Sequence, residues 1–353
     1  MDTGGSPGPM SQYRTNISVD AIVDRLTSAS SILISTHAKP DGDAMGSMLA
    51  LARGLRQKGL ASSIHVTGPI EPNLLMLAAD VDLNVMPGQM PADTIDLSVI
   101  LDTGAWGQLP DLGAWLRGRE DQVIVIDHHS RGDVEIASSR LVDSTAASTT
   151  QVLLPVLEAM GCNIHEGGAD GSGSIAEALF VGLATDTGWF RFSNADAEAF
   201  RIASTLLEGG LDKSRLYRMI EENHRPARLA LTARAIESIE FLQNGAIALM
   251  RLRPDDFEDT GGSLEDLNGV VNEPMAIGTV EMSILLTQVE QGLTKASFRS
   301  KPPRGGSAAM DVNVFAGRFG GGGHVHAAGA RFQCDIDEAA GAITRSLEED
   351  PLS

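Results

Sequence analysis

Residues 31–47 of this chain, SILISTHAKPDGDAMGS, join a short apolar run to a group of metal-ligand residue types. The apolar run predicts a buried strand, and His37, Asp41 and Asp43 follow it within seven positions. A carboxylate buried without a partner loses several kcal/mol of solvation free energy. The sequence therefore predicts that positive charge meets these aspartates.

Two further apolar runs predict buried strands, LSVIL at 97–101 and QVIVI at 122–126. The segment after the first strand predicts a helix, with Asp43 at its N-cap and Gly59 at its end. Continuous apolar runs that alternate with helical segments are typical of a parallel sheet covered on both faces. We therefore expect an α/β fold in the first part of the chain.

The second part of the chain has a different pattern from about residue 239 onward. IALMRL, VEMSILLTQV and KASFRS predict strands, and the short segment EQGLT predicts a hairpin turn between the last two. The expected organisation is a disordered lead-in at 1–15, a catalytic α/β domain at 16–205, a helical connector at 206–238 and a smaller α/β domain at 239–353.

Composition indicates an ordinary soluble globular protein, since 42% of the 353 residues are apolar and 21% are charged. The N-terminal residues lack the basic and apolar regions of a signal peptide, and no apolar run approaches the ~18 residues of a membrane helix. Cys162 and Cys334 form no paired motif. We expect a cytoplasmic protein.

The formal net charge of −20 argues against a long nucleic-acid duplex as the partner, because nonspecific binding depends on summed positive charge. Residues 291–332 are an exception, with one acid, Asp311, against six bases. The bases of this segment are Lys295, Arg299, Lys301, Arg304, Arg318 and Arg331. A basic segment in an acidic chain indicates a small anion held at one place.

Acids and histidines follow each of the three predicted strands. His37 ends the first, Asp102 the second, and Asp127, His128 and His129 the third. The carboxyl ends of parallel strands form one edge of a sheet, where ligands bind. Another acid, at position 186, lies near the end of a predicted helix and is expected to reach the same edge.

Four carboxylates at this edge would repel one another without cations, and two divalent ions would offset their charge. Oxygen donors with some imidazole suit Mn²⁺, with Mg²⁺ or Co²⁺ as alternatives. Two metal ions ~3.5–4 Å apart are a common device for displacement at phosphorus, in which they activate water and stabilise the leaving oxygen. We therefore predict a two-metal hydrolase.

Five motifs occur in an order that resembles the DHH-family phosphoesterases with their associated C-terminal substrate domain. They are HAKPDGDAMGS, LDTG, DHH, TDTGWFRFSN and FGGGGHVHAAGA, and they span residues 37–329. The subgroup that the chain most resembles is the nanoRNase type, an oligoribonuclease that is also a 3′-phosphoadenosine 5′-phosphate (pAp) phosphatase. The resemblance implies an active site in the cleft between the two domains and, as an expectation from the family alone, a homodimer.

The resemblance also implies a metal-ligand set. One ion is expected on His37 and Asp41, a second on Asp43, His128 and Asp186, and Asp102 is expected to bridge both.

Three residues are expected to carry catalytic roles, Asp102, Asp127 and His129. Because adjacent side chains on an extended segment point apart, His128 and His129 are expected to differ in role. His129 is the candidate for a phosphate contact or for the proton donor to the leaving group. Asp127 is expected to orient His128 or to cap the loop.

The glycine-rich segment at 320–329 follows a helical pattern instead of a strand, so it does not fit a dinucleotide-binding fingerprint. Glycines allow backbone N–H groups to approach a phosphate closely, and an arginine in SFRSK can bind the same group bidentately. The candidate substrate-binding residues are Arg299, Ser300, Lys301, Gly321, Gly322, Gly323 and His324.

The favoured hypothesis is a Mn²⁺-dependent phosphohydrolase that degrades short oligoribonucleotides to nucleoside 5′-monophosphates, dephosphorylates pAp, or both. Short RNA and small nucleotides are the expected partners, without long duplexes or membranes. The alternatives that stay open are a c-di-AMP or pApA phosphodiesterase, a pyrophosphatase or exopolyphosphatase, and a non-catalytic nucleotide-binding regulator.

Overall fold

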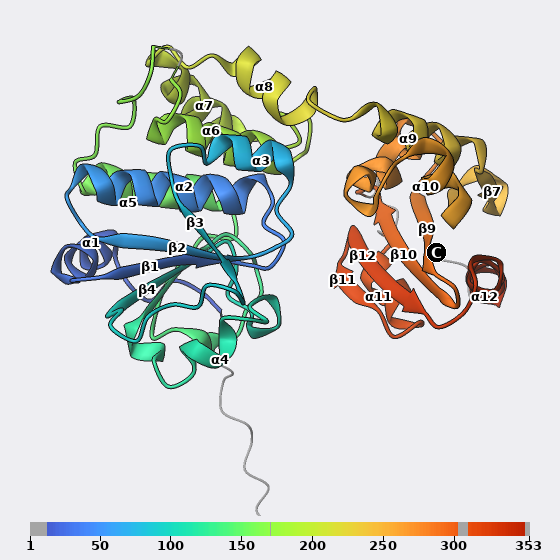
Figure 1. Ribbon diagram of the computed structural model, residues 1–353, viewed down its shortest axis with the longest axis horizontal. Coiled ribbons are helices and arrows are strands. Elements are labelled where there is room, and N and C mark those ends of the chain that lie inside the picture. Colours follow the sequence, from blue (N-terminus) through green and yellow to red (C-terminus); the bar gives the residue numbers. More distant parts are fainter. Residues whose placement is uncertain (1–12, 170, 303–309, 350–353) are drawn as a thin grey trace, which may run out of the picture. The chain divides into compact units, whose positions relative to one another are not determined.

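The computed structural model describes residues 13–169, 171–302 and 310–349. The chain divides into two compact units, Met1–Asn223 and His224–Ser353, each with its own sheet (Figure 1). This division falls inside the expected connector, because α8 (Lys213–Glu221) belongs to the first unit and α9 (Pro226–Glu237) to the second. Pro226 lies at the start of α9, where its missing N–H is tolerated, and it could not continue α8.

The first unit contains, within the described ranges, a six-stranded parallel sheet of order β3-β2-β1-β4-β5-β6. This confirms the predicted parallel sheet, although the sequence patterns indicated only its central strands. The strands are β1 (Ile32–Thr36), β2 (Ser62–Thr67), β3 (Leu83–Met86), β4 (Leu97–Leu101), β5 (Val123–Asp127) and β6 (Ser139–Val142).

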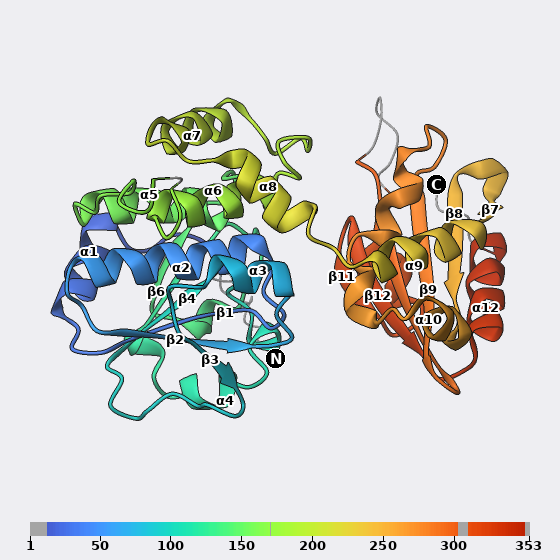
Figure 2. The same ribbon diagram turned by 45° about the horizontal axis from the view of Figure 1, so that its top comes forward.

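Helices cover both faces of this sheet (Figure 1). Helices α2 and α5 lie on one face and α4 on the other, whereas α6 packs on α2 and α5, and α7 packs on α6 in a further layer (Figure 2). Their bounds, with those of α1 and α3, are α1 (Val19–Ser28), α2 (Gly42–Gln57), α3 (Pro72–Leu77), α4 (Gly113–Leu116), α5 (Thr149–Ala159), α6 (Ile175–Asp186) and α7 (Ala197–Glu208). Short 3-10 turns occur at Trp106–Gln108, Glu120–Gln122 and Val134–Ile136.

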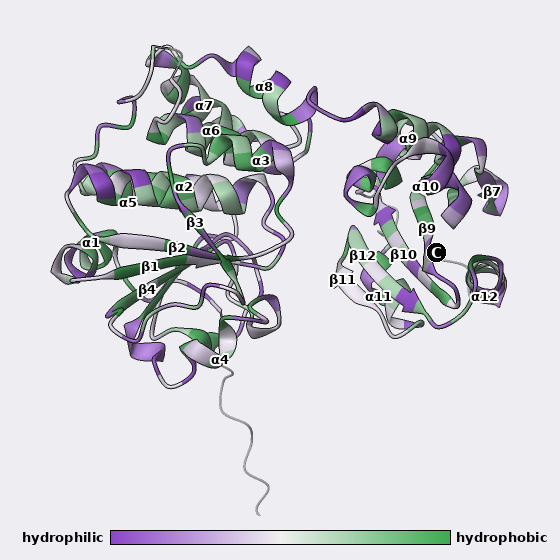
Figure 3. Ribbon diagram, viewed as in Figure 1, coloured by the Kyte–Doolittle hydropathy of each residue, from purple (hydrophilic) through white to green (hydrophobic). Residues whose placement is uncertain are grey.

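The apolar runs of the central strands are continuous because both faces are buried (Figure 3). In β1, Ile32 and Ile34 pack into the core beneath α2, whereas Leu33 packs into the core on the α4 side. The same alternation holds in β4, where Val99 and Ile100 face opposite cores. Burial of both faces is what removes the polar alternation expected of a sheet with one wet face.

The strand order reverses direction between β1 and β4. From β1 the chain passes through α2 to β2 on one side, and from β4 it passes through α4 to β5 on the other. In open α/β sheets, such a switch point leaves a crevice at the carboxyl ends of the two strands. His37 and Asp102 are the residues that directly follow these two strands.

The segment before α1 differs from the expected disordered lead-in. Residues 1–12 lie outside the described residues, but Tyr13 to Thr15 pack on the first unit. The Thr15 hydroxyl donates to the Val142 carbonyl at 2.8 Å, and the Asn16 amide side chain donates to Ser138 O at 2.9 Å. Within the described residues, the chain therefore contacts the first unit from Tyr13 onward.

The second unit contains a mixed sheet of order β11-β12-β10-β9-β8-β7, six-stranded within the described ranges. The predicted hairpin is confirmed, since β9 and β10 pair in antiparallel fashion around Gly292. The strands are β7 (Glu240–Leu242), β8 (Ile247–Leu252), β9 (Met282–Glu290), β10 (Leu293–Ser300), β11 (Gly322–His324) and β12 (Ala327–Phe332).

Each face of this second sheet has its own core. Helices α11 (Val312–Gly317) and α12 (Ile336–Glu349) cover one face, and α9 with the 3-10 turn Val270–Ala276 covers the other. The remaining elements are α10 (Pro254–Thr260) and the 3-10 turns Gln243–Gly245 and Leu264–Leu267. The predicted helix in DVNVFAGRF corresponds to α11.

The helices are short, and α2, with 16 residues, is the longest in the described part of the chain. None of the described helices combines the length and the apolar character needed to cross a membrane. Cys162 and Cys334 are free and partly buried.

Candidate metal centre

Carboxylates and imidazoles from five segments of the first unit meet at the carboxyl edge of the sheet. They form three overlapping groups whose possible ligand atoms lie within 4.8 Å of one another. The groups are His37, Asp41 and Asp102; Asp43, His128 and Asp186; and Asp102, His128 and His129. The structure therefore brings together all six residues that the sequence indicated as metal ligands.

Asp102 lies at the centre of these groups. Its Oδ2 is 3.4 Å from His37 Nε2, and its Oδ1 is 3.7 Å from His128 Nε2. The side chain is buried, and the residue has a φ of 59°, in the left-handed region that non-glycine residues rarely adopt. Such backbone strain persists where the surrounding structure enforces it, and it is concentrated at functional sites.

Both central histidines are oriented by backbone carbonyls. His37 Nδ1 lies 3.0 Å from the Ala38 carbonyl, and His128 Nδ1 lies 3.2 Å from the Ala146 carbonyl. A carbonyl only accepts, so each Nδ1 carries the proton and donates. Each ring then directs Nε2 toward the carboxylates, which is the orientation of a metal-binding histidine.

Asp41 and Asp43 have separate positions at the start of α2. Asp41, and not Asp43 as expected, is the N-cap, and its side chain accepts from the Asp43 and Ala44 amides at 3.1 Å. The glycine between them is required by packing more than by a turn, because a Cβ at Gly42 would overlap the Thr185 hydroxyl on α6. This close approach brings the ends of α2 and α6 together, and with them Asp43 and Asp186.

Asp43 is buried and binds the N-terminus of α5. Its Oδ2 accepts from the Thr149 amide at 2.6 Å, and its Oδ1 accepts from the Thr150 amide at 3.1 Å. The Thr149 hydroxyl also donates to Asp102 Oδ1 at 2.9 Å. The sequence analysis missed these threonines, although Ser148 and the following Thr-Thr form a helix N-terminus, which favours anions.

The electrostatics of the site show uncompensated negative charge. Burial raises the pKa of Asp102 well above its ordinary value, and the charges of Asp43 and Asp41 raise it further. Burial also raises the pKa of Asp43. Burial, with the charges of Asp43 and Asp41, raises the pKa of Asp186 to about 8. Divalent cations would remove this penalty, and the oxygen and imidazole donors present fit Mn²⁺, Mg²⁺ or Co²⁺.

Asp127 orients His129, and the expectation that it orients His128 is wrong. Asp127 Oδ1 accepts from His129 Nδ1 at 2.7 Å and from the amides of His128 and His129 at 2.8 and 3.1 Å. The loop-capping role expected of Asp127 is therefore present. These bonds, from His129 above all, lower the pKa of Asp127 although burial alone would raise it. Asp127 in turn raises the pKa of His129 against the effect of burial.

The two adjacent histidines do not point apart as expected. Their ring centroids are 4.6 Å apart, and His129 Nδ1 lies 3.8 Å from Asp102 Oδ1. The reason is that β5 ends at Asp127, so the backbone at these positions is no longer an extended strand. Both rings therefore face the same carboxylate.

In the second unit, strand β12 lies between Arg299 on β10 and the candidate glycines at β11. Arg299 on β10 pairs with Ala327 on β12, which pairs in turn with His324 on β11. Burial lowers the pKa of Arg299, whose guanidinium donates to the Phe298 carbonyl at 2.9 Å. The side chain of His324 lies outside the part that the structure describes, as does Arg304.

Other candidate substrate-binding groups have partners inside the second unit. Ser300 is buried, and its hydroxyl lies 2.9 Å from His326 Nδ1. Lys301 Nζ donates to the Ile277 carbonyl at 2.7 Å. The Gly323 amide, expected to face a phosphate, donates to Asn313 Oδ1 at 2.8 Å. Arg299 is therefore the stronger candidate among the side chains that the structure describes.

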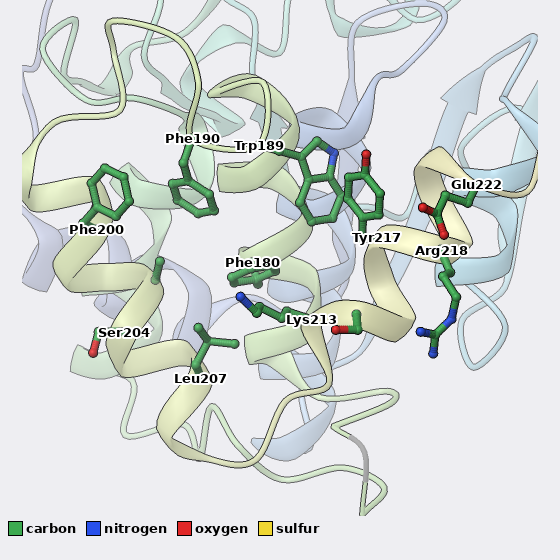
Figure 4. A pocket seen from close by; sticks show the side chains of 12 residues that line it. Phe180, Trp189, Phe190, Phe200, Ser204, Leu207, Lys213, Tyr217, Arg218 and Glu222 are labelled. Atoms are coloured by element: carbon green, nitrogen blue, oxygen red, sulfur yellow. The ribbon is translucent and has the colours of Figure 1, made fainter.

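A cavity of about 700 Å³ lies between α6, α7 and α8 (Figure 4). Aromatic side chains line much of it, among them Phe180, Trp189 and Tyr217, and Lys213 lies beside Phe180. The cavity shares no residue with the carboxylate groups of the sheet edge. Sequence analysis did not indicate this cavity, because its lining comes from three helices and from the turn after α6. The aromatic residues of TDTGWFRF were the one feature of the sequence that pointed to it.

Comparisons with known proteins agree with this geometry. The family model described as DHH family, N-terminal domain, matches residues 31–183. A bifunctional oligoribonuclease and PAP phosphatase NrnA of Thermus thermophilus is 30% identical over 322 residues, which cover 90% of each chain. The cyclic-di-AMP phosphodiesterase PdeA of Listeria monocytogenes is 24% identical over 91% of this chain and 48% of that protein.

A solved structure is similar over nearly the whole chain. It is an exopolyphosphatase-related protein from Bacteroides fragilis, with a TM-score of 0.82, 25% identity, and coverage of 94% of this chain and 95% of that one. The family match, the relative at 30% identity and the grouped aspartates and histidines all indicate the same chemistry. The chain belongs to the DHH family and is a metal-dependent phosphoesterase.

Proposed function

We propose that this phosphoesterase hydrolyses short oligoribonucleotides to nucleoside 5′-monophosphates and also removes a phosphate from pAp. The convergence of three aspartates and three histidines around a fourth aspartate, Asp102, is the observation that carries the hydrolytic part. The substrate class is supported by the relative in Thermus thermophilus, which is named an oligoribonuclease and PAP phosphatase.

The proposal gives the sheet edge two divalent cations, with Mn²⁺ favoured. His37, Asp41 and Asp102 would hold one ion, and Asp43, His128 and Asp186 the other, with Asp102 shared between them. When bound, such a pair supplies activation of a water molecule and neutralisation of charge on the leaving oxygen. The protein's own contribution is a set of ligands fixed in advance by Thr149, Thr150 and two backbone carbonyls.

His129 is proposed as the group that contacts the reacting phosphate or gives a proton to the leaving oxygen. Its Nδ1 donates to Asp127 Oδ1 at 2.7 Å, and this bond fixes the ring beside the carboxylates of the sheet edge. A hydrogen-bonded carboxylate holds an imidazole in one orientation and stabilises its protonated form, which is the form that donates.

The second unit is proposed to hold a phosphate of the substrate. Arg299 offers a planar set of donors that matches phosphate geometry, and the backbone of His324 lies opposite it across β12, with Gly322 opposite Ser297. Ser300, Lys301, Gly323 and His324 complete the candidate set, with Ser300, Lys301 and Gly323 already engaged within the unit. One phosphate-binding site in a chain of net charge −20 favours short ligands over long polymers, because a polymer would bring many phosphates close to the acidic surface.

A second candidate is a c-di-AMP or pApA phosphodiesterase. The similarity to PdeA over 91% of this chain favours it, because the whole two-unit body is matched. The identity of 24%, against 30% for the oligoribonuclease, places it second.

A substrate panel in Mn²⁺ tests the proposal. It compares pAp, pApA, c-di-AMP, a 5-mer RNA, a 24-mer RNA and pyrophosphate, and a parallel series contains a chelator. We expect turnover of pAp, pApA and the 5-mer, with slow cleavage of the 24-mer. Fastest turnover of c-di-AMP would select the second candidate, and activity on pyrophosphate alone would contradict both.

Asp102→Asn separates an enzyme from a nucleotide-binding protein. We expect turnover to fall about 10³-fold or more, since removal of one stabilising group at a reacting centre already costs about 10²–10³-fold. Asp93→Asn is the matched control, because Asp93 is exposed and pairs only with Arg119 in the described part of the chain. Equal turnover in both variants would exclude Asp102 from the chemistry.

A further inference from the structure

Tyr13 contacts the candidate catalytic site from outside the motifs that define it. Its hydroxyl donates to Asp127 Oδ2 at 2.5 Å across 114 positions of sequence. Burial, and after it the charge of Asp127, raises the pKa of Tyr13 above its ordinary value, so the hydroxyl keeps its proton and remains the donor. Nothing in the residues around Tyr13 predicts this contact.

The ring of Tyr13 occupies a space that two glycines leave open. A Cβ at Gly104 would overlap the Tyr13 hydroxyl, and a Cβ at Gly132 would lie 2.5 Å from a ring carbon. Gly104 follows β4 and Gly132 follows β5, so the ring packs against both loops that leave the metal edge of the sheet. The absent side chains allow this close approach of ring and backbone.

The four bonds to Asp127 divide between its two oxygens. Oδ1 takes His129 Nδ1 and the amides of His128 and His129, and Oδ2 takes Tyr13. Asp127 has no exposed surface, so water does not replace the Tyr13 hydroxyl without a rearrangement. Loss of that hydroxyl would leave a buried oxygen short of its donor and free the carboxylate to rotate.

We propose that Tyr13 is a positioning residue for this reaction. By holding Oδ2, the hydroxyl fixes the plane of the Asp127 carboxylate, and Oδ1 then holds the His129 ring in its orientation toward Asp102. This inference rests on the proposed role of His129 at the substrate phosphate. The alternative is that Tyr13 only anchors the segment before α1 to the first unit.

Tyr13→Phe tests the proposal because it removes the hydroxyl and keeps the ring between the two glycines. We expect kcat for pAp to fall about 10–100-fold with KM changed less than threefold, since a small displacement of a catalytic group costs up to about 10²-fold. Thr15→Val is the matched control: it removes another hydroxyl that anchors the same segment, to Val142, and should leave kcat unchanged.

A double-mutant cycle distinguishes positioning from anchoring. If Tyr13 acts through Asp127, Tyr13→Phe should have no further effect on kcat in an Asp127→Asn background. The same loss in both backgrounds, or an unchanged kcat in Tyr13→Phe alone, would overturn the proposal.

A measurement on the metal-free protein separates this inference from the proposed function. Tyr13→Phe should shift the ¹⁵N imidazole resonances of His129, and Thr15→Val should not. If they shift while the wild-type protein hydrolyses none of the panel substrates, the positioning contact stands and the proposed function fails. Unshifted resonances would overturn the positioning role whatever the activity.

Discussion

The candidate sites of the two units hold charges of opposite sign that are wholly or partly removed from water. In the first, Asp43 and Asp102 are almost fully buried, and burial raises the pKa of both. In the second, burial lowers the pKa of Arg299 on β10. In each case desolvation works against the charged form, and a ligand of the opposite charge would relieve it.

Under the proposed function, the two units would meet groups of opposite charge on the substrate and its cations. A phosphate ester with divalent cations brings positive charge to the aspartates and negative charge to Arg299. Among the described residues, histidines are the only ion-pair partners that the aspartates of the metal centre have. We therefore expect variants of the first unit to change the rate of chemistry, and variants of the second to change substrate binding.

Among the variants that test these different roles of the two units, Arg299→Ala has the largest expected effect. KM for pAp should rise about 10–100-fold, since a hydrogen bond to a charged group contributes about 1.5–3 kcal/mol, and kcat should change less than KM. The measurement is steady-state kinetics with pAp in Mn²⁺.

Arg299→Lys is the matched variant, because it keeps the charge and loses the planar pair of donors. An intermediate KM would show that bidentate geometry matters. A fall in kcat at constant KM in Arg299→Ala would contradict the proposal that the second unit contributes to substrate binding and the first to the rate of chemistry.

The sequence was most informative where burial is complete. The patterns of β1, β4 and β5 predicted a parallel sheet because both faces of these strands lie in apolar cores, which leaves no polar alternation. The strands β2, β3 and β6 were missed, since they are partly exposed and mixed with polar residues such as His65 and Asn84. The order of the strands, and hence the switch point, came only from the structure.

The candidate site was predictable to the extent that it follows strand ends. His37, Asp102 and His128 follow buried strands directly, so their meeting at one edge is a property of any parallel sheet. The contacts of Thr149 and Tyr13 were not predictable, because each joins elements more than 40 positions apart in sequence. Loop conformation also decided which histidine Asp127 orients, and no periodic pattern describes a loop.

Removal of metal should make stability depend on pH in a defined direction. The folded chain without cations holds Asp186 with a pKa of about 8, and burial raises the pKa of Asp102 as well. A group whose folded pKa is raised stabilises the fold below its unfolded pKa, and that contribution is lost as pH rises through the folded value. We expect chelated protein to lose thermal stability between pH 5 and pH 8.

Thermal unfolding with a chelator, compared with Mn²⁺ at each pH, measures this effect. Mn²⁺ should restore more of the Tm at pH 8 than at pH 5, by a few degrees, and Asp102→Asn should flatten the chelated profile. The exposed Asp93→Asn variant should follow the wild type. Chelated protein that is more stable at pH 8 than at pH 5 would show that the aspartates are not the dominant buried charges.

The smallest effect concerns the glycines of the second unit, which have two separable roles. A Cβ at Gly321 would overlap the Gly329 carbonyl, so Gly321→Ala should destabilise the second unit by about 1–3 kcal/mol, as overpacking does. At Gly322 the nearest atom to a Cβ is Asn313 Oδ1 at 3.6 Å, so Gly322→Ala should fold normally. If the segment also approaches a phosphate, Gly322→Ala should raise KM for pAp a few-fold at unchanged Tm.

A normal KM in Gly322→Ala would mean that these glycines only allow close packing on β12. Arg299 would then bind the phosphate without their backbone amides.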